Sequence, residues 1–400
     1  MSRRLLAAGL KPAFSLALLV LLLELGLRLL PSSIPPGLLA RFQSEIRGPI
    51  ARQRGLPTND DVRYLDRTDG GPPLRLWKPG ARITMAYGDV GSVPTVEMDG
   101  IGFPNPPGLA ERATFDVVAI GDSFTFCTNV TPVETWPHQL AAITGMSVLN
   151  LGKGAIGPYA YLEILRRYGL EKRPRIVVMN VYEGNDLRDA TRYRRHREQG
   201  AGGADGVSHE APSISPRRSY AINLIGALAE VVFESITPPE ADFRYRVTLA
   251  GGRSLQINGD NADLDEVATA RALERGELDL GVWDGALAAF VALAREHEFQ
   301  AVVTYSPSAY SAYERSVVFE DPSLADPMRR FSHRQREWLT EAAERHGFQF
   351  LDLTPPLQAR ADRSETSLYF PLNRHYAQAG HRAVAEILAE TLNSGTGIAP

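Results

Sequence analysis

Ser123 lies in the stretch GDSFTF (121–126), which follows the apolar run FDVVAI at 115–120. A serine hydroxyl attacks an acyl carbon when a base removes its proton and hydrogen-bond donors stabilise the oxyanion that forms. The run before Ser123 has the composition of a buried strand, and a helical pattern begins near Thr135. Ser123 could therefore act at a strand end. In the alternative interpretation, Asp122 and Ser123 only bond backbone amides of a turn.

Three later stretches could supply the remaining groups. The loop NLGKGAIGP (150–158) has small residues whose backbone amides can approach an oxyanion. The stretch VYEGNDLRD (181–189) places Asn185 after another apolar run, so its side-chain amide can donate a further hydrogen bond. The stretch FPLNRHYAQAGH places His375 just before the last helical pattern, where it is a candidate base.

The four stretches follow, in chain order, four of the five strands of one predicted sheet. Short apolar runs alternate with amphipathic patterns typical of helices. The runs lie at 115–120, 147–151, 176–181, 301–305 and 348–353, and the helical patterns at 135–144, 159–168, 285–297, 333–346 and 377–392. This alternation predicts an α/β fold with a mostly parallel, five-stranded sheet and helices on both faces. Ligand sites of such sheets form at the carboxyl ends of the strands.

In this order, the four stretches resemble the GDSL/SGNH hydrolase superfamily over about Ala113 to Leu392, apart from an insertion. The resemblance implies a flavodoxin-like three-layer α/β/α sandwich. An N-terminal apolar run and the segment VEMDGIGF before the sheet are similar to membrane-anchored bacterial members, some of which act in O-acylation of extracellular polysaccharides.

The resemblance also implies a role for each candidate residue. Ser123 is expected to be the nucleophile and the first oxyanion donor. The amide region of Gly154 and Ala155 is expected to be the second donor, and Asn185 the third. His375 is expected to be the base.

The chain departs from the family pattern at the acid of the triad. That acid lies two or three residues before the histidine, where this chain has Asn373 and Leu372. An amide can orient the ring of His375, but it cannot stabilise the imidazolium by charge. Asn373 is therefore the candidate orienter. Asp352, Glu365 or a backbone carbonyl are the alternatives.

Two smaller departures concern Ala155 and Cys127. Ala155 stands where the family often has glycine, and alanine costs little there unless a positive φ is required. Cys127 stands where glycine commonly follows the GDSFTF stretch, and we interpret it as a small packed residue. As the only cysteine, it excludes an intramolecular disulfide.

The N-terminal residues 1–31 are predicted to form a cytosolic tail and a transmembrane anchor. The apolar run from Pro12 to Leu30 is about long enough to cross a hydrocarbon core of roughly 30 Å. Glu24 and Arg28 interrupt it, but their spacing allows them to pair on a helix. Basic residues before the run favour a catalytic domain outside the cytosol, at the periplasmic or extracellular face. A cleaved signal peptide is the alternative.

Two further regions complete the predicted organisation. Residues 32–112 form a lead-in segment packed on the main domain, and residues 113–393 form the hydrolase-like domain with an insertion at about 188–284. The insertion contains a polar stretch, an apolar helical run at 219–236 and a hairpin pattern around Gly251 and Gly252. It could roof the active site or decorate one edge of the sheet.

Composition excludes several classes of partner. A net charge of −4, from 43 basic and 47 acidic residues, gives no electrostatic argument for nucleic acid, which would call for a basic surface. Neither HxH nor HExxH spacing occurs, and no nucleotide-binding loop is present, so we expect neither a metal nor a cofactor. The basic run at 192–197 could contact an anionic glycan or lipid headgroups, or form a solvated helix face.

Three functions remain. The leading hypothesis is an esterase that forms an acyl-Ser123 intermediate and passes the acyl group to water. An O-acyltransferase that modifies a cell-surface or extracellular polysaccharide would use the same residues. The neutral Asn373 also permits a catalytically weak glycan-binding or assembly protein. The expected partners are an acyl ester or acylated glycan, and the membrane through the N-terminal helix.

Overall fold

The computed structural model describes residues 15, 18–39, 41–53, 63–66, 72–84, 95–126, 128–199, 218–236, 245–257 and 261–395. The chain divides into two compact units. The first comprises Met1–Arg63 and Gly206–Glu240, and the second comprises Tyr64–Asp205 and Ala241–Pro400. All four stretches with candidate chemistry belong to the second unit.

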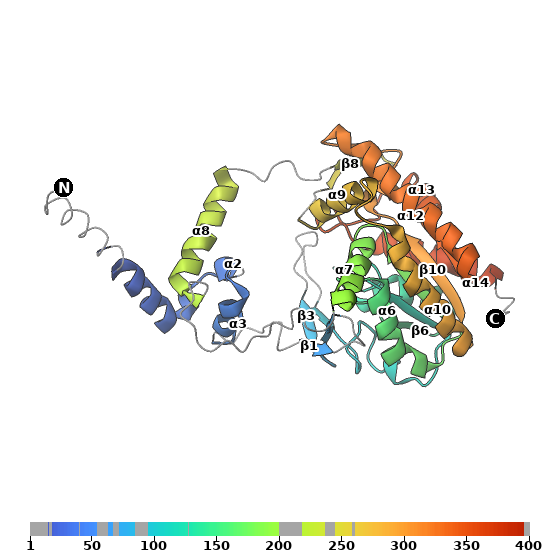
Figure 1. Cartoon of the computed structure of the whole chain (residues 1–400), viewed down its shortest axis with the longest axis horizontal. Coiled ribbons are helices and arrows are strands. Elements are labelled where there is room, and N and C mark those ends of the chain that lie inside the picture. Colours follow the sequence, from blue (N-terminus) through green and yellow to red (C-terminus); the bar gives the residue numbers. More distant parts are fainter. Residues whose placement is uncertain are drawn as a thin grey trace. The chain divides into compact units, whose positions relative to one another are not determined.

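Parallel strands form the central sheet of the second unit (Figure 1). The strands are β5 (Val117–Gly121), β6 (Val148–Asn150), β7 (Ile176–Tyr182), β10 (Gln300–Ser306) and β12 (Gln349–Asp352). Their order across the sheet is β12-β10-β7-β5-β6, and every neighbouring pair is parallel. Each strand coincides with a predicted apolar run, which confirms the five-stranded parallel sheet. Strands β5 and β7 are buried along their whole length, which explains why their sequences do not alternate.

The predicted helices flank this sheet. They are α5 (Trp136–Thr144), α6 (Pro158–Ile164), α10 (Asp284–Glu296), α12 (Ala325–His346) and α14 (Gln378–Gly395). Helix α5 packs against α14, whereas α10 packs against α6 and α12. Helix α6 continues as a π-helical turn, Leu165–Gly169. Helices α11 (Ala309–Ala312) and α13 (Thr354–Ala361) were not predicted, because each is too short to show a helical period.

Small sheets precede the central sheet. Strand β1 (Arg63–Asp66) pairs with β2 (Leu74–Trp77), and β3 (Arg82–Thr84) pairs with β4 (Thr95–Glu97). After β4, the Asp99 carboxylate accepts hydrogen bonds from the backbone of Ile101 and Phe103 and from the Asn105 amide. The Asn105 amide also donates to the backbone carbonyl of Asn150, at a distance of 2.9 Å. This turn therefore joins the lead-in segment to the end of β6.

The insertion has several parts. Helix α7 (Asp186–Gln199) carries the basic run at 192–197. Helix α8 (Tyr220–Ile236) belongs to the first unit. Strands β8 (Tyr245–Thr248) and β9 (Ser254–Ile257) are antiparallel, which confirms the predicted hairpin, and β11 (Val318–Phe319) pairs with β8. Helix α9 (Asn261–Glu274) and the 3-10 helix η7 (Leu280–Trp283) complete the insertion. Most of the polar stretch lies outside the described residues.

The first unit has its own hydrophobic core. It contains a helix at residues 18–29, η1 (Pro31–Ser33), α2 (Pro36–Leu39), α3 (Ser44–Gln53) and α8. Side chains from the N-terminal elements bury Tyr220 and Ala227 of α8 in this core; they are Leu27, Ile34, Leu39, Phe42, Ile46 and Ile50. The structure divides the predicted lead-in segment between the two units, and its packing on the main domain stays a prediction. Its first part, up to Arg63, belongs to the first unit, where its apolar side chains pack against α8.

The N-terminal apolar run lies partly outside the described residues. No helix in the described part of the chain is long and apolar enough to cross a membrane. The transmembrane anchor in residues 1–31 therefore stays a prediction.

Gly152 provides a test of the packing that holds the serine turn. A Cβ atom added at Gly152 would lie 2.6 Å from the backbone of both Thr125 and Phe126. We therefore expect Gly152→Ala to lower the free energy of unfolding by about 1–3 kcal/mol, as measured by urea denaturation. Gly100→Ala is the matched control, because nothing lies within 4 Å of a Cβ atom there. Equal effects of the two substitutions would contradict this packing.

Candidate active site

Ser123 and His375 meet at the carboxyl end of the sheet. The Oγ atom of Ser123 lies 2.7 Å from Nε2 of His375, although the two residues are 252 positions apart in the chain. Ser123 follows the end of β5, and His375 precedes α14. The two residues predicted as nucleophile and base are therefore within hydrogen-bond distance.

A tight turn fixes the position of His375. The backbone N–H of Phe370 donates to the carbonyl of His375, and the N–H of Arg374 donates to the carbonyl of Phe370. Tyr369 and Tyr376 form an antiparallel bridge on either side of the turn. Arg374 adopts a φ of 60°, a left-handed conformation that reverses the chain just before His375.

Asn373 contacts His375 through two groups. Its backbone carbonyl lies 2.9 Å from Nδ1 of the imidazole, and its side-chain Oδ1 accepts the backbone N–H of His375 at 3.0 Å. The backbone carbonyl, rather than the side-chain amide, is therefore the group of Asn373 at Nδ1. Of the two distant alternatives, Asp352 accepts hydrogen bonds from Arg336 and the backbone of Thr354.

The Gly154–Ala155 segment lies beside Ser123. A Cβ atom added at Gly154 would lie 3.5 Å from Cβ of Ser123, so this backbone passes close to the serine. The Lys153 ammonium group donates to the Gly154 carbonyl at 2.7 Å. Because the carbonyl and N–H of one peptide point in opposite directions, this bond orients the Ala155 amide. Ala155 has a φ of 63°, so the positive φ that would make alanine costly is present.

Asn185 follows β7 and is partly buried. Its side-chain amide donates to Asp189 at 2.9 Å. Since an amide nitrogen carries two hydrogens, this bond uses one of the two donors of Asn185. The hydrogen bonds of the described residues include none between Asn185 and Ser123. The oxyanion role of Asn185 therefore stays a prediction.

Aromatic side chains pack around His375. The Phe124 ring stacks on Tyr182, with ring centroids 3.8 Å apart, and its centroid lies 5.0 Å from that of His375. Tyr376 packs edge-on against Phe124. Sequence reasoning missed these rings, because only the folded chain brings Phe124 and Tyr182 together.

Buried amides tie the serine turn to the neighbouring strands. Asn150 donates to the carbonyl of Thr125, and Asn180 donates to the Thr125 hydroxyl. Thr304 and Ser306 in turn donate to Asn180. Asn150 and Asn180 lie within apolar strand sequences, and this placement was the signal that could have revealed them. Buried amides are retained when they are hydrogen-bonded.

Asp122 is a buried carboxyl next to Ser123. Its Oδ1 accepts the backbone N–H of Phe124 at 2.8 Å, and its Oδ2 lies 3.4 Å from Ser123 Oγ. Burial raises the pKa of Asp122 to about 7. Because the contact of Ser123 with His375 is much shorter, His375 is the better placed proton acceptor.

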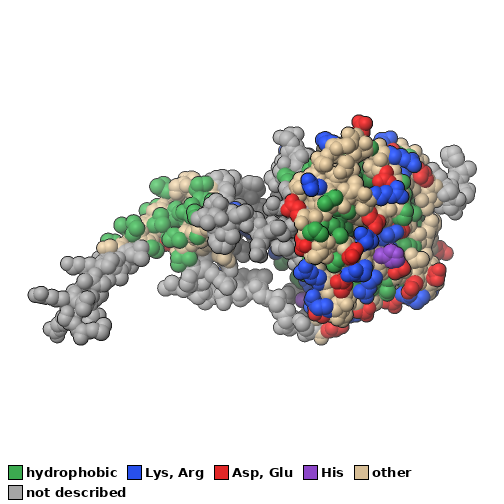
Figure 2. All heavy atoms as spheres, turned by 90° about the horizontal axis from the view of Figure 1, so that it is seen from above, with side chains coloured by type: hydrophobic (Ala, Val, Ile, Leu, Met, Phe, Trp, Pro, Cys, Tyr) green, Lys and Arg blue, Asp and Glu red, His purple; other side chains and the backbone are tan. Residues whose placement is uncertain are grey.

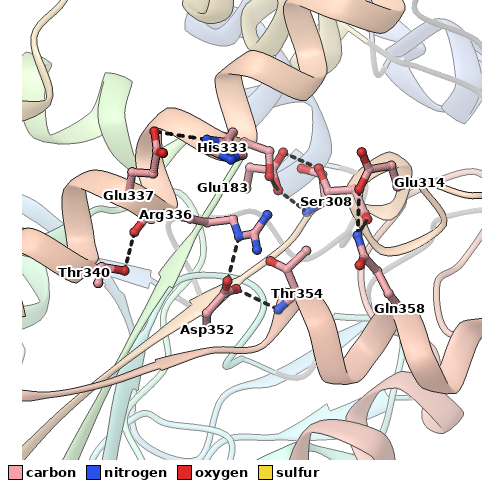
Figure 3. Close-up of polar contacts among 12 residues, drawn as sticks. Glu183, Ser308, Glu314, His333, Arg336, Glu337, Thr340, Asp352, Thr354 and Gln358 are labelled. Carbon is pink, nitrogen blue, oxygen red and sulfur yellow. Dashed lines mark hydrogen bonds and ion pairs between the residues drawn. The ribbon is translucent and has the colours of Figure 1, made fainter.

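Glu183 connects the end of β7 to the helices that follow β10 (Figure 3). Its carboxylate accepts hydrogen bonds from the hydroxyls of Ser311 and Ser332 and from the backbone N–H of Ser308. Burial, followed by the charge of Glu266, raises the pKa of Glu183 to about 7. Glu183 therefore holds the loop that carries Asn185, and it can change its charge near neutral pH.

A second histidine near the site, His381, has a structural position. His381 is buried, and its Nδ1 accepts the backbone N–H of Trp136 at the start of α5. Burial, followed by the charge of His375, lowers the pKa of His381 to about 3, so its ring is neutral. Among the described residues, no cluster of His, Cys, Asp or Glu could hold a metal ion. Cys127 lies outside the described residues.

Comparison with known proteins assigns the family. The profile of the GDSL-like Lipase/Acylhydrolase family matches residues 119–383. This chain belongs to that family of ester hydrolases. No curated protein sequence matches the chain.

Solved structures give more distant likenesses. A member of the lipolytic protein G-D-S-L family from Veillonella parvula DSM 2008 is 10% identical, with a TM-score of 0.37, over 70% of this chain and 98% of its own. A catalytic mutant of Axe2, an acetylxylan esterase from Geobacillus stearothermophilus, is 12% identical, with a TM-score of 0.36, over 72% of this chain and 96% of its own. Likenesses at this level carry no weight for substrate or mechanism.

Glu183 makes the stability of the protein depend on pH. Its pKa rises from 4.5 to about 7 on folding, so the folded state keeps this proton more strongly than the unfolded state. The stability from this group is present below about pH 4.5 and is lost as the pH rises through about 7. We therefore expect Glu183→Gln to weaken the fall in unfolding free energy between about pH 5 and about pH 8. Urea denaturation at both pH values measures it.

Glu337→Gln is the matched control for this substitution. Glu337 is an exposed carboxylate on α12 that pairs with His333. Its removal should leave the pH dependence close to that of the unmodified protein. A Glu183→Gln curve that stays parallel to the unmodified one would contradict the assignment.

Proposed function

We propose that this chain is a serine-dependent acyl ester hydrolase that acts through an acyl-Ser123 intermediate, with His375 as the base. The observation that carries the proposal is the 2.7 Å contact between Ser123 Oγ and His375 Nε2. The family, defined by residues 119–383, supports ester hydrolysis as the reaction class. The strand order, with β5 between β6 and β7, supports assignment to the flavodoxin-like and SGNH type.

The carbonyl of Asn373 sets the protonation of His375. A carbonyl oxygen only accepts hydrogen bonds, so Nδ1 must carry a hydrogen to bond it. In the neutral imidazole, Nε2 is then an acceptor, and the Ser123 hydroxyl donates to it. As Ser123 Oγ bonds the acyl carbon, its proton passes to Nε2, and the imidazolium then gives a proton to the leaving alkoxide. In the second half of the reaction, water attacks the acyl carbon and gives its proton to Nε2. The imidazolium then returns a proton to Ser123 Oγ as the acid product leaves.

The oxyanion would be held by neutral donors. The backbone N–H of Ser123, the amides of Gly154 and Ala155, and the second amide hydrogen of Asn185 are the candidates. The bond between Lys153 and the Gly154 carbonyl supports this assignment, because it fixes one peptide of the set before substrate binds. Donors positioned in advance stabilise charge without reorganisation during the reaction.

We also propose that the domain acts outside the cytosol, on an acyl ester or acylated glycan, and is held at the membrane by residues 1–31. The apolar run from Pro12 to Leu30 and the basic residues before it support this location. An O-acyltransferase would use the same serine and histidine. Acyl transfer to a polysaccharide acceptor, compared with hydrolysis, separates the two.

Substitution of the two central residues tests the proposal. The full chain should react with a fluorophosphonate probe and hydrolyse a soluble short-chain ester. Ser123→Ala should abolish labelling and lower kcat on the order of 10³-fold or more, and His375→Ala should act similarly, because each removes a partner of one proton transfer. His333→Ala is the matched control, since His333 is exposed on α12. A wild-type chain that neither labels nor turns over ester would refute the catalytic role.

Asn373→Asp tests whether His375 functions beside a neutral residue at position 373. In Asn373→Asp, the side chain can still accept the backbone N–H of His375, and its negative charge would stabilise the imidazolium. We expect kcat to be equal or higher, and the acidic limb of the kcat/KM profile to move to higher pH as the pKa of His375 rises. A tenfold loss of kcat with an unshifted profile would instead assign a separate role to the amide.

A further inference from the structure

Helix α8 exposes one apolar face. Its large apolar side chains recur three or four residues apart, which places them on one side of a helix. They are Ile222, Ile225, Leu228, Val231 and Val232, with exposed fractions of 48%, 49%, 45%, 40% and 53%. An apolar face of this kind on a soluble surface marks an interaction site.

The opposite face of α8 is already used. Tyr220 and Ala227 are buried in the core of the first unit, against residues of the N-terminal elements. Asn223 accepts the backbone N–H of Gln43 at 2.8 Å and donates to the carbonyl of Ser219. The position of α8 within its unit is therefore fixed, and the exposed face points away from that core.

The helix at residues 18–29 adds to the apolar surface of the same unit. Most of its leucines are exposed, and only Leu27 among them is buried in the core. The exposed ones are Leu18, Leu19, Leu21, Leu22, Leu25 and Leu29. Hydrophobic side chains gather over this unit in Figure 2, whereas Lys, Arg, Asp and Glu are scattered over the second unit.

The charged residues within the apolar run serve the start of α8. The Glu24 carboxylate accepts the Ser219 hydroxyl and the backbone N–H of Ala221, each at 2.8 Å. Arg28 pairs with Glu24 at 2.6 Å, donates to the carbonyl of Arg218, and lies 4.8 Å from the centre of the Tyr220 ring. The predicted pair therefore has a second function, because it satisfies polar groups at a helix end that would otherwise need water.

We propose that the exposed face of α8 binds lipid and lies in one leaflet of the bilayer that holds the N-terminal helix. The exposed apolar side chains of both helices, and the pairing of Glu24 and Arg28 with the start of α8, favour lipid over an aqueous protein partner. With 17 residues, α8 is about 25 Å long and is too short to cross a hydrocarbon core of roughly 30 Å. We therefore place its apolar face within one leaflet. The inference rests on the membrane location proposed above.

Site-specific fluorescence in vesicles tests this inference with the full chain. Cys127 is the only cysteine, so Cys127→Ala gives a background for single labels. Ile225→Cys, Leu21→Cys and Glu337→Cys each receive an environment-sensitive nitrobenzoxadiazole label. Each labelled protein is then reconstituted in vesicles of equimolar phosphatidylethanolamine and phosphatidylglycerol. Circular dichroism and urea denaturation check that each variant folds.

Leu21 marks the N-terminal helix and Glu337 marks the aqueous surface of the second unit. We expect the label at 225 to emit at a shorter wavelength than the label at 337. Spin-labelled acyl chains should quench the label at 225 several-fold more than aqueous iodide does, and the label at 21 should behave in the same way. The label at 337 should show the reverse.

Three outcomes would overturn the inference. If the label at 225 behaves like that at 337 while the label at 21 is in lipid, the membrane location stands and the role of α8 fails. If the labels at 21 and 225 both behave like that at 337, the proposed location fails as well. If the label at 225 escapes both quenchers, and the unlabelled Ile225→Cys variant forms a disulfide with a second copy when an oxidant is added, a protein interface covers the face instead.

Discussion

The contact between Ser123 and His375 is the interaction on which the site depends. It requires the lone pair of Nε2 to face the hydroxyl, and the backbone carbonyl of Asn373 sets this arrangement by holding the hydrogen on Nδ1. The parallel sheet contributes by placing the serine turn at the end of β5. The turn between Tyr369 and Tyr376 contributes by presenting His375 from the other end of the sequence.

Neutral groups recur around this contact. The backbone carbonyl of Asn373 lies at Nδ1 of His375, and burial raises the pKa of Asp122 to about 7, so the charge of Asp122 beside Ser123 is reduced. The site therefore depends more on the fixed positions of Ser123 and His375 than on a neighbouring charge. The rings of Phe124 and Tyr182, and the amides that bond Thr125, supply rigid positioning.

Sequence patterns predicted the elements of the central sheet and the placement of Ser123 and His375, because buried strands read as apolar runs and their carboxyl ends must share one edge. They could not predict which atom of Asn373 faces Nδ1, because the sequence gives the residue type and not the direction of its backbone carbonyl or its side chain. Nor could they predict the partners of Glu24. The four-residue spacing predicted that Glu24 pairs with Arg28. Ser219 lies 195 residues from Glu24, and only the packing of the first unit brings the two residues close.

Acyl transfer to Ser123 is tested most directly by rapid acid quench of the protein during turnover of an activated acetyl ester, followed by mass spectrometry of its peptides. The acetyl group should appear on the peptide that contains Ser123 within the first turnover, and it should accumulate when hydrolysis of the intermediate limits the rate. Turnover with no acetylated intermediate, or with the acetyl group on another residue, would contradict the assignment of Ser123 as the nucleophile.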